Sequence, residues 1–256
     1  MMPFFSNERE QAIILAKEDG IMAGSVILEQ GYSLLHPAIQ VELHVAEGMQ
    51  FQKGEIIASV TGPVRSILTG ERVLLNLLQR LSGIATVTAR AVELLDDRSI
   101  RICDTRKTTP GLRMLEKYAV RCGGGFNHRL GLDQAVLLKE NHLAASGGIK
   151  PAVSLVKSKL GHTVKIEVET TNRQEVLEAV DAEVDIIMFD NAAPEEVKHY
   201  LQIVPEEIVT EASGGITLDN ISRYRNCGVD YLSLGFLTHS IRAIDLSMLL
   251  KKEEAF

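Results

Sequence analysis

The first quarter of the chain alternates short apolar runs with turns that contain glycine. Three runs, at residues 11–17, 39–46 and 54–62, have the length and composition of β-strands. The segments between them contain EDG and AEG, and glycine supplies the backbone freedom that tight turns need. This pattern predicts a small sheet that ends near residue 65.

From residue 69 the spacing of the apolar residues becomes helical. Positions i, i+3, i+4, i+7 and i+10 hold Leu74, Leu77, Leu78, Leu81 and Ile84. We therefore expect one long amphipathic helix. Arg72 lies off the apolar stripe near the start of this helix, where it is either a solvated side chain or one that reaches an interface.

Beyond residue 100, apolar runs of strand length alternate with helical segments. The runs are 101–103, 135–139, 164–169, 184–190, 207–212 and 229–235, and the helices fit 150–160, 173–182, 194–203 and 217–226. Such alternation predicts a parallel sheet covered by helices. The roughly 155 residues after position 100 are fewer than the roughly 250 of an eight-fold barrel. We therefore predict an α/β fold with an incomplete parallel barrel of six or seven strands.

Three of the predicted strands end on a charged residue followed by a short polar loop. These residues are Lys139, Glu169 and Asp190. The carboxyl ends of barrel strands share one face, and barrel enzymes place their chemistry there. The two acids either neutralise neighbouring cations or bind Mg²⁺ and a ribose in a site that handles phosphates.

Composition narrows the possible partners. The 256 residues are 45% hydrophobic, carry a net charge of −7, and contain no apolar run long enough to span a bilayer. We expect a cytoplasmic protein that does not bind membranes, and the acidic balance argues against a nucleic-acid partner. Cationic charge is nevertheless concentrated locally, because residues 101–139 contain eight Lys or Arg against three acids. The three cysteines lack metal-site or disulfide spacing and are expected to be buried thiols.

In each of the last two predicted strand–helix units, a glycine-containing loop joins the strand to the helix. The segment EASGGITLDN (211–220) predicts a strand, a glycine pair and a helix opened by Thr217, and LSLGFLTHS (232–240) repeats this arrangement. Paired glycine loops on the last strands of a barrel are typical of a phosphate site. The alternative is two tight turns between strands and helices.

A further glycine run, in RCGGGFNHRLGL (121–132), precedes His128 and Arg129. Together with Arg106 and Lys107 of CDTRKTTPGL (103–112) and with Lys139, these residues form a convergent cationic set suited to carboxylates or phosphates. No Ser-His-Asp or Cys-His order and no zinc motif occurs. The residues therefore predict an enzyme that binds anions on two sides of a pocket.

Several segments in order along the chain resemble quinolinate phosphoribosyltransferase, the nicotinate-nucleotide pyrophosphorylase (carboxylating) family. They include LTGERVLLNLLQRLSGIAT (68–86), DTRKTTPGLRMLEKYAVRCGGGFNHRLGL (104–132), LLKENH (137–142), IEVE (166–169), MFDN (188–191), EASGGIT (211–217) and GVDYLSLGFLTHS (228–240). The resemblance implies an N-terminal α+β open-sandwich domain with a long linking helix at 1–98 and a barrel domain at 99–245. It also implies a C-terminal segment at 246–256 that packs back on the first domain.

The family reaction joins quinolinate to phosphoribosyl pyrophosphate (PRPP) with Mg²⁺, giving nicotinate mononucleotide, pyrophosphate and CO₂ for NAD biosynthesis. The resemblance implies that a homodimer with shared sites performs it. Quinolinate would be held by Arg106, His128, Arg129 and the partner's copy of Arg72. PRPP would be held by Lys107, Lys139, Glu169, Asp190, Ser213, Gly214, Gly215 and Gly235. Of these, Lys107, Lys139, Glu169 and Asp190 would be catalytic, and Glu169 and Asp190 would bind Mg²⁺.

The chain departs from the family pattern in two places. Family members begin with an additional helical stretch before AIILAKEDG (12–20), and KENH (139–142) replaces the commoner KDNH. A paralogue associated with molybdenum-transport operons shares the fold, but Lys139 and the complete NHR favour the quinolinate enzyme. A nicotinate-using relative fits less well, because four cations suit two carboxylates. A carrier or non-catalytic anion-binding protein is the alternative from another class, since VAEGMQFQKGEIIASVTG (45–62) resembles a carrier half-barrel without its modified lysine.

Overall fold

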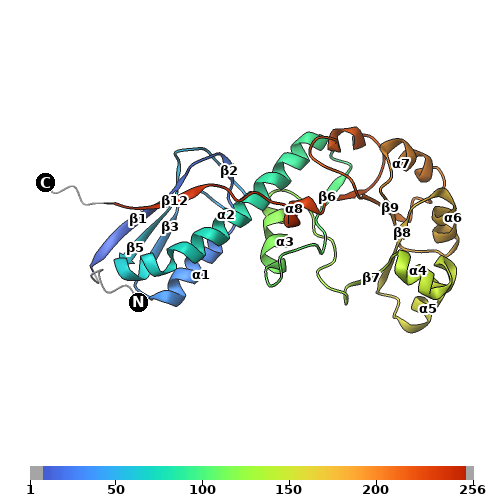
Figure 1. Ribbon diagram of the computed structural model, residues 1–256, viewed down its shortest axis with the longest axis horizontal. Coiled ribbons are helices and arrows are strands. Elements are labelled where there is room, and N and C mark those ends of the chain that lie inside the picture. The colour runs from blue at the N-terminus through green and yellow to red at the C-terminus, as the bar shows by residue number, and fades with distance from the viewer. Residues whose placement is uncertain (1–7, 252–256) are drawn as a thin grey trace. The chain divides into compact units, whose positions relative to one another are not determined.

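The computed structural model describes residues 8–251, which form two compact units (Figure 1). The first unit comprises the described residues up to 89, residues 114–124, and the residues from 240 onward. The second unit comprises residues 90–113 and 125–239. The second unit holds all the cavity residues considered below.

An antiparallel sheet forms the first unit, with strand order β12-β1-β5-β3. The strands are β1 (Arg9–Ala16), β3 (Gln40–Leu43), β5 (Ile56–Pro63) and β12 (Leu246–Leu250), and β2 (Gly20–Ile21) pairs separately with β4 (Gln50–Phe51). In β1 the alternate residues Ala12, Ile14 and Ala16 are buried and enter the core, as expected of a sheet with one covered face. The predicted small sheet is therefore confirmed, and the C-terminal strand β12 pairs with β1.

Helix α1 (Ser25–Leu35) is absent from the sequence prediction, which expected only strands before residue 65. Its amino terminus is capped from a distant segment: the Glu47 carboxylate accepts hydrogen bonds from the backbone N–H groups of Gly24 (2.6 Å) and Ser25 (2.9 Å). The residue that precedes a helix is often Ser, Thr, Asp or Asn, whose side chain caps the first backbone N–H groups. The missing local cap explains why the pattern did not reveal this helix.

The long predicted helix is confirmed as α2 (Val64–Leu95), which begins five residues before the predicted start. Leu74 and Leu78 of its apolar stripe enter the core of the first unit. Close packing of α2 against α1 requires a glycine, because a Cβ at Gly31 would lie 2.3 Å from Leu74 Cδ2. Helix α3 (Arg113–Cys122) packs beside α2 through an ion pair between Glu116 and Arg80 (2.7 Å).

Six parallel strands form the second unit, in the order β6-β11-β10-β9-β8-β7. They are β6 (Arg101–Cys103), β7 (Ala135–Leu138), β8 (Lys165–Thr170), β9 (Ile186–Asp190), β10 (Val209–Ser213) and β11 (Tyr231–Ser233). Among the described residues, the edge strands β6 and β7 do not pair with each other. The prediction of an incomplete six- or seven-stranded parallel barrel with an α+β N-terminal part is confirmed.

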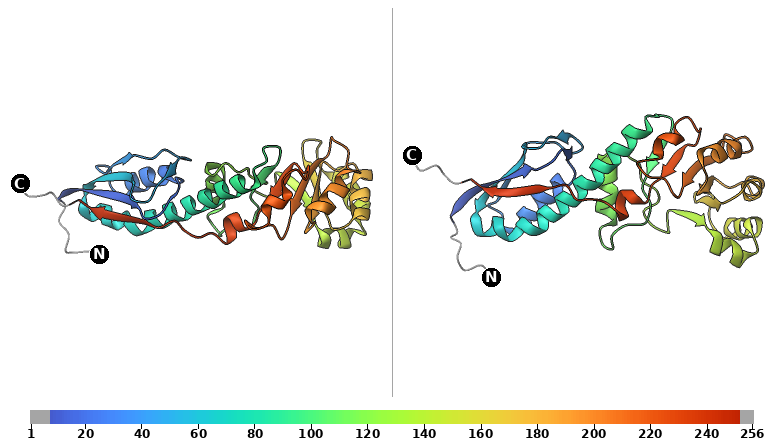
Figure 2. Two further views of the ribbon diagram at one scale, coloured as in Figure 1. Left: turned by 90° about the horizontal axis from the view of Figure 1, so that it is seen from above. Right: turned by 45° about the horizontal axis from the view of Figure 1, so that its top comes forward.

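Helices cover the outside of this sheet (Figure 2). They are α4 (Glu140–Ser146), α5 (Ile149–Lys159), α6 (Arg173–Asp181) and α7 (Pro194–Leu201), and a short helix, α8 (Phe236–His239), follows β11. Three of them confirm the helices predicted at 150–160, 173–182 and 194–203. No helix in the described part of the chain is both long and apolar enough to cross a membrane.

The helix predicted at 217–226 is wrong, because only a 3-10 turn, η1 (Ile221–Tyr224), forms there. The side chain of Asn220 accepts a hydrogen bond from Thr217 N–H (2.8 Å) and donates one to the Gly215 carbonyl (2.9 Å). Such side-chain bonds compete with the helical pattern of backbone bonds. The glycine pair is therefore followed by a polar turn.

Candidate active site

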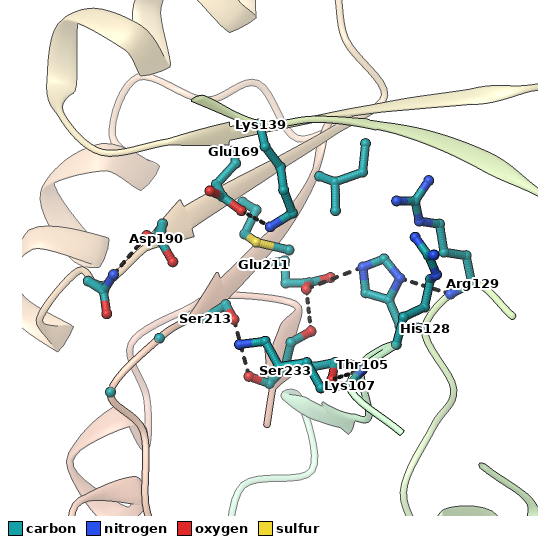
Figure 3. Close-up of a pocket in the computed structure, with 16 residues that line it drawn as sticks. Thr105, Lys107, His128, Arg129, Lys139, Glu169, Asp190, Glu211, Ser213 and Ser233 are labelled. Atoms are coloured by element: carbon teal, nitrogen blue, oxygen red, sulfur yellow. Dashed lines mark hydrogen bonds and ion pairs between the residues drawn. The ribbon is translucent and has the colours of Figure 1, made fainter. Parts of the chain in front are cut away.

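A cavity of about 700 Å³ lies at the carboxyl end of the parallel strands (Figure 3). It is lined by Thr105, Arg106, Lys107, His128, Arg129, Leu137, Lys139, Glu169, Met188, Asp190, Asn191, Glu211, Ser213, Gly214, Gly215 and Ser233. Side chains alternate between the two faces of a strand, so residues two apart, such as Glu211 and Ser213 of β10, line the same cavity. The ends of five strands thus contribute to one site.

The cationic loop after β6 is held by hydrogen bonds of its own threonines and of Thr238 in helix α8. Thr105 Oγ1 accepts a bond from the backbone N–H of Lys107 (3.0 Å), and Thr238 Oγ1 donates one to the Lys107 carbonyl (2.8 Å). Backbone N–H of Thr108 donates to the Arg106 carbonyl (2.9 Å). Gly235 lies beside this loop: a Cβ there would be at contact distance from Lys107 Cδ (3.4 Å) and closer to His239 Nε2 (3.0 Å).

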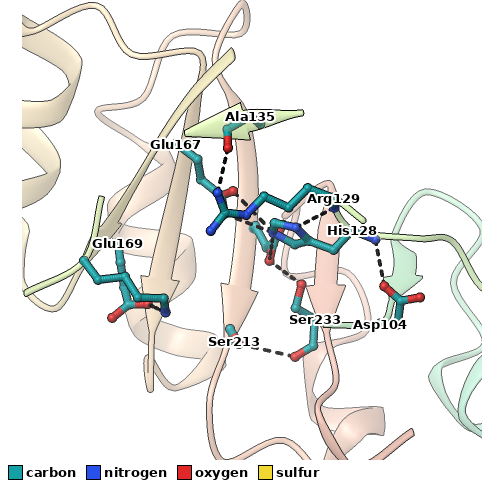
Figure 4. A network of polar contacts seen from close by, with 10 residues as sticks. Asp104, His128, Arg129, Ala135, Glu167, Glu169, Ser213 and Ser233 are labelled. Atoms are coloured by element: carbon teal, nitrogen blue, oxygen red, sulfur yellow. Dashed lines mark hydrogen bonds and ion pairs between the residues drawn. The ribbon is translucent and has the colours of Figure 1, made fainter. Parts of the chain in front are cut away.

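Asp104 ties the cationic loop to the segment that carries His128 and Arg129. Its fully buried carboxylate accepts hydrogen bonds from Asn127 Nδ2 (2.6 Å) and from the backbone N–H of His128 (2.9 Å) (Figure 4). A buried carboxylate needs such donors because it has lost its hydration. The arrangement brings two cationic segments, separated by more than twenty residues in the sequence, to one side of the cavity.

Arg106 and Arg129 on this side each have an Nε–H donor without a hydrogen-bond partner in the described structure. Arg129 donates from Nη1 to the Ala135 carbonyl (2.6 Å), but both Nε atoms are buried. Burial, together with the nearby charge of Arg106, lowers the pKa of Arg129, against the opposing effect of Glu167. An anion bound here would satisfy the donors and relieve the repulsion.

The opposite wall of the cavity carries the acids that end β8 and β9. Glu169 forms an ion pair with Lys139, the residue that follows β7, and the Asp190 carboxylate accepts a hydrogen bond from Asn191 Nδ2 (2.7 Å). Glu169 and Asp190 lie at the ends of adjacent paired strands. Two carboxylates so placed are the oxygen donors through which Mg²⁺ is usually held beside substrate phosphates. The donor set therefore fits Mg²⁺.

A glycine turn follows β10 beside these acids. Gly214 and Gly215 both have positive φ, at 85° and 63°. The turn packs against Asn191, whose backbone N–H donates to the Ser213 carbonyl (2.8 Å), and a Cβ at Gly214 would lie 2.3 Å from Asn191 Oδ1. Such a turn leaves backbone N–H groups free to face an anion.

Glu167 and Glu211 also belong to the site, although the sequence reasoning missed them. Both are buried acids two residues before a predicted site residue, Glu169 and Ser213 respectively. Glu167 lies 3.3 Å and Glu211 3.6 Å from His128 Nε2, and Glu211 accepts a hydrogen bond from Ser233 Oγ. Burial, and next to it the charge of Glu167, raises the pKa of Glu211 to about 7, against the opposing effects of His128, Ser233 and Lys139. The two-residue alternation of the strands is the signal that could have found them.

The structure brings ten of the twelve predicted site residues to the cavity wall: Arg106, Lys107, His128, Arg129, Lys139, Glu169, Asp190, Ser213, Gly214 and Gly215. Gly235 lies beside Lys107 without lining the cavity. Arg72 is exposed on α2 in the first unit and is not among the lining residues. The roles of these residues toward substrates stay predictions.

A parallel α/β barrel that gathers four cations, two acids and a glycine turn at its carboxyl edge defines an enzyme for anionic substrates. Residues 4–82 match the family model described as quinolinate phosphoribosyl transferase, N-terminal domain, and residues 84–249 match the model of its C-terminal domain. The chain belongs to the quinolinate phosphoribosyltransferase family, as its motifs predicted.

Individual relatives agree with this assignment along nearly the whole chain. A Bacillus subtilis (strain 168) protein named probable nicotinate-nucleotide pyrophosphorylase (carboxylating) is 52% identical over 244 residues, which cover 95% of this chain and 84% of that protein. The Homo sapiens nicotinate-nucleotide pyrophosphorylase (carboxylating) is 37% identical over 249 residues, with coverage of 95% and 83%. The crystal structure of NadC from Streptococcus pyogenes superposes with a TM-score of 0.93 at 40% identity, covering 97% of this chain and 88% of that one.

Proposed function

We propose that the protein is a quinolinate phosphoribosyltransferase that converts quinolinate and PRPP into nicotinate mononucleotide, pyrophosphate and CO₂. The observation that carries the proposal is the division of one cavity into two anion-binding sides. Buried, unpartnered Nε donors of Arg106 and Arg129 lie on one side, and the Gly214–Gly215 turn lies on the other. Such a cavity suits a dicarboxylate and a phosphorylated sugar that must meet despite their mutual repulsion.

On the first side, Arg106 and Arg129 would hold the carboxylates of quinolinate through charge-assisted hydrogen bonds. His128 lies on the same wall, but its ring nitrogens contact the backbone N–H of Arg129 and the carboxyl groups of Glu167 and Glu211, so we do not place it among the quinolinate ligands. Lys107 and Lys139 would lie where the two substrates meet, so their charges offset the repulsion between them. The ring nitrogen would thereby be held facing the ribose, and holding two reactants in line is a large part of the rate enhancement available to such an enzyme.

On the second side, the Ser213–Gly214–Gly215 turn, with Gly235, would bind the 5′-phosphate through backbone N–H groups. Glu169 and Asp190 would accept hydrogen bonds from the ribose hydroxyls and hold Mg²⁺. When bound, Mg²⁺ would offset charge on the pyrophosphate. The ring nitrogen attacks the anomeric carbon, the bond to pyrophosphate breaks, and the two carboxylates stabilise the positive charge that develops on the ribose.

We also propose that the protein acts in the cytoplasm as a homodimer, with Arg72 entering the partner's site. Exposed apolar side chains in the first unit support a protein interface there. Val73, next to Arg72 on α2, is 62% exposed, and Leu34 on α1 is 88% exposed. Burial against a second copy would remove both side chains from water.

The test uses quinolinate labelled in the carboxyl group next to the ring nitrogen. We expect labelled CO₂ only when PRPP and Mg²⁺ are both present, together with one nicotinate mononucleotide for each CO₂. Omission of PRPP is the matched control. The proposal fails if no labelled CO₂ is released while nicotinate is converted, or if another pyridine or a non-pyridine acid is the substrate, as expected of the molybdenum-operon paralogue.

A further inference from the structure

Loss of CO₂ from the quinolinate nucleotide leaves an electron pair on a ring carbon, and that carbon must then receive a proton. We infer that Glu211, backed by Glu167 and His128, is the acid that delivers this proton. The inference rests on the proposed function. It assigns a catalytic role to a residue that otherwise only lines the cavity.

The three residues form a layer between two cavities inside the barrel. The substrate cavity lies at the strand ends, whereas a second cavity of about 260 Å³ is lined by the first residues of four strands: Ala135, Ile186, Val209 and Tyr231. His128 and Glu211 line both cavities. A group in this layer can therefore give a proton to one side and regain it from the other.

Hydrogen bonds fix which atom of His128 carries its proton. The backbone N–H of Arg129 donates to Nδ1 (2.8 Å), so Nδ1 must have a free electron pair and the ring proton must be on Nε2. Nε2 faces the carboxyl groups of Glu167 (Figure 4) and Glu211 (Figure 3). The ring is thus a neutral donor to the acid pair.

Glu211 is the member of the pair that is suited to hold a proton. It is buried, and burial together with the neighbouring charge of Glu167 raises its pKa to about 7. The groups that face Glu211 are Glu167 of β8, His128, Ser233 of β11 and Lys139.

The cluster suits a proton better than a metal ion. Its three ligand atoms lie within 4.8 Å of one another, a spacing that a cation could also use. However, His128 Nε2 already bonds Glu167 (3.4 Å), Glu211 already accepts a hydrogen bond from Ser233 Oγ, and the neighbouring Arg129 would repel a divalent cation. A proton satisfies the acid pair without added positive charge.

The bond between the ring carbon and the carboxylate breaks, CO₂ leaves, and the electron pair stays on the ring carbon beside the positively charged ring nitrogen. The Glu211 O–H bond then breaks, its proton forms the new C–H bond, and Glu211 becomes a carboxylate held by Ser233 Oγ and His128 Nε2. Water in the second cavity, which has room for it, returns the proton.

The experiment compares the wild-type enzyme with Glu211→Gln in the presence of quinolinate, PRPP and Mg²⁺. Pyrophosphate release and CO₂ release are measured separately in a single turnover. We expect Glu211→Gln to slow CO₂ release about 100-fold, because the carbanion recaptures CO₂, while pyrophosphate release changes less than about threefold. CO₂ release by Glu211→Gln within about threefold of wild type would overturn the inference.

Two further variants keep the test decisive if Glu211→Gln fails to fold. The wild-type rate of CO₂ release should fall as the pH rises and Glu211 loses its proton. Ser233→Ala removes a bond that favours the carboxylate, so the fall should move to higher pH. Glu167→Gln removes a neighbouring negative charge, so the fall in the rate of CO₂ release should move to lower pH. An unchanged profile in both variants would refute the inference, whereas wild-type protein that releases no CO₂ from quinolinate would refute the proposed function instead.

Discussion

Gly214→Ala should damage the phosphate side of the cavity because Gly214 is constrained both by its backbone and by its neighbour. Its φ is 85°, and a Cβ would lie 2.3 Å from Asn191 Oδ1 and 3.0 Å from Asn191 N. A non-glycine residue in the left-handed region costs about 1–2 kcal/mol, and overpacking costs about 1–3 kcal/mol more. We therefore expect a loss of about 2–5 kcal/mol in the free energy of unfolding if the turn is kept.

If the turn instead shifts to relieve the contact, the cost should appear in substrate binding. We expect the KM for PRPP to rise at least about tenfold, which corresponds to about 1.4 kcal/mol, with less change in the KM for quinolinate. Urea unfolding and steady-state kinetics measure the two effects. The reasoning predicts that at least one of them is large.

Gly147→Ala is the matched control for the backbone contribution. Gly147 has a similar φ of 81° but no atom within 4 Å of an added Cβ. It should therefore show only the backbone cost of about 1–2 kcal/mol and leave the KM for PRPP unchanged. If Gly214→Ala behaves like Gly147→Ala in both assays, the contact with Asn191 does not constrain the turn and the reasoning is refuted.

Three other experiments test separate parts of the structure. Glu47→Gln should lower the free energy of unfolding by about 1–2 kcal/mol, measured in urea. Hydrogen bonds from Gly24 and Ser25 outweigh burial and lower the pKa of Glu47, so the difference from wild type should be full above about pH 4.3 and shrink as the pH falls through the lowered value. Arg72→Ala and Arg106→Ala, each inactive, should partly regain activity when mixed, and no regain after proven subunit exchange would contradict a shared site. Removal of Mg²⁺ by a chelator should stop pyrophosphate release, and readdition should restore it; activity without any divalent ion would contradict the role of Glu169 and Asp190.

The parallel barrel could be predicted from the sequence because its strands are short apolar runs separated by helices of ordinary length. The charged residues that end three of these runs, Lys139, Glu169 and Asp190, reach one cavity because parallel strands share a carboxyl edge. The same reasoning located the glycine turn after β10. Local patterns therefore sufficed wherever strand direction alone decides the position of a residue.

Other features depend on contacts between distant segments. Helix α1 is capped by Glu47, twenty-two residues after Ser25, and no local pattern announces such a cap. The helix predicted after the glycine pair is replaced by a turn because Asn220 bonds back to Gly215 and Thr217. In both cases a side chain forms hydrogen bonds with backbone groups, and the spacing of apolar residues does not predict such bonds.

The buried acids were missed for a related reason. Glu167 and Glu211 lie within strands, where a charged residue usually marks a solvent-facing position. Inside this barrel the alternate face is a polar cavity, so both carboxyl groups turn inward and meet His128. Their place follows from Glu169 and Ser213 by the two-residue alternation, but only once the interior of the barrel is known to be polar.

The central claim is that one cavity binds a pyridine dicarboxylate beside PRPP and removes one of its carboxylates. The most direct measurement compares kcat/KM for quinolinate and nicotinate, each with PRPP and Mg²⁺, while CO₂ and pyrophosphate are quantified together. The account predicts that quinolinate is strongly preferred and gives equal amounts of CO₂ and pyrophosphate. Equal or better use of nicotinate, or pyrophosphate release from quinolinate without matching CO₂, would contradict it.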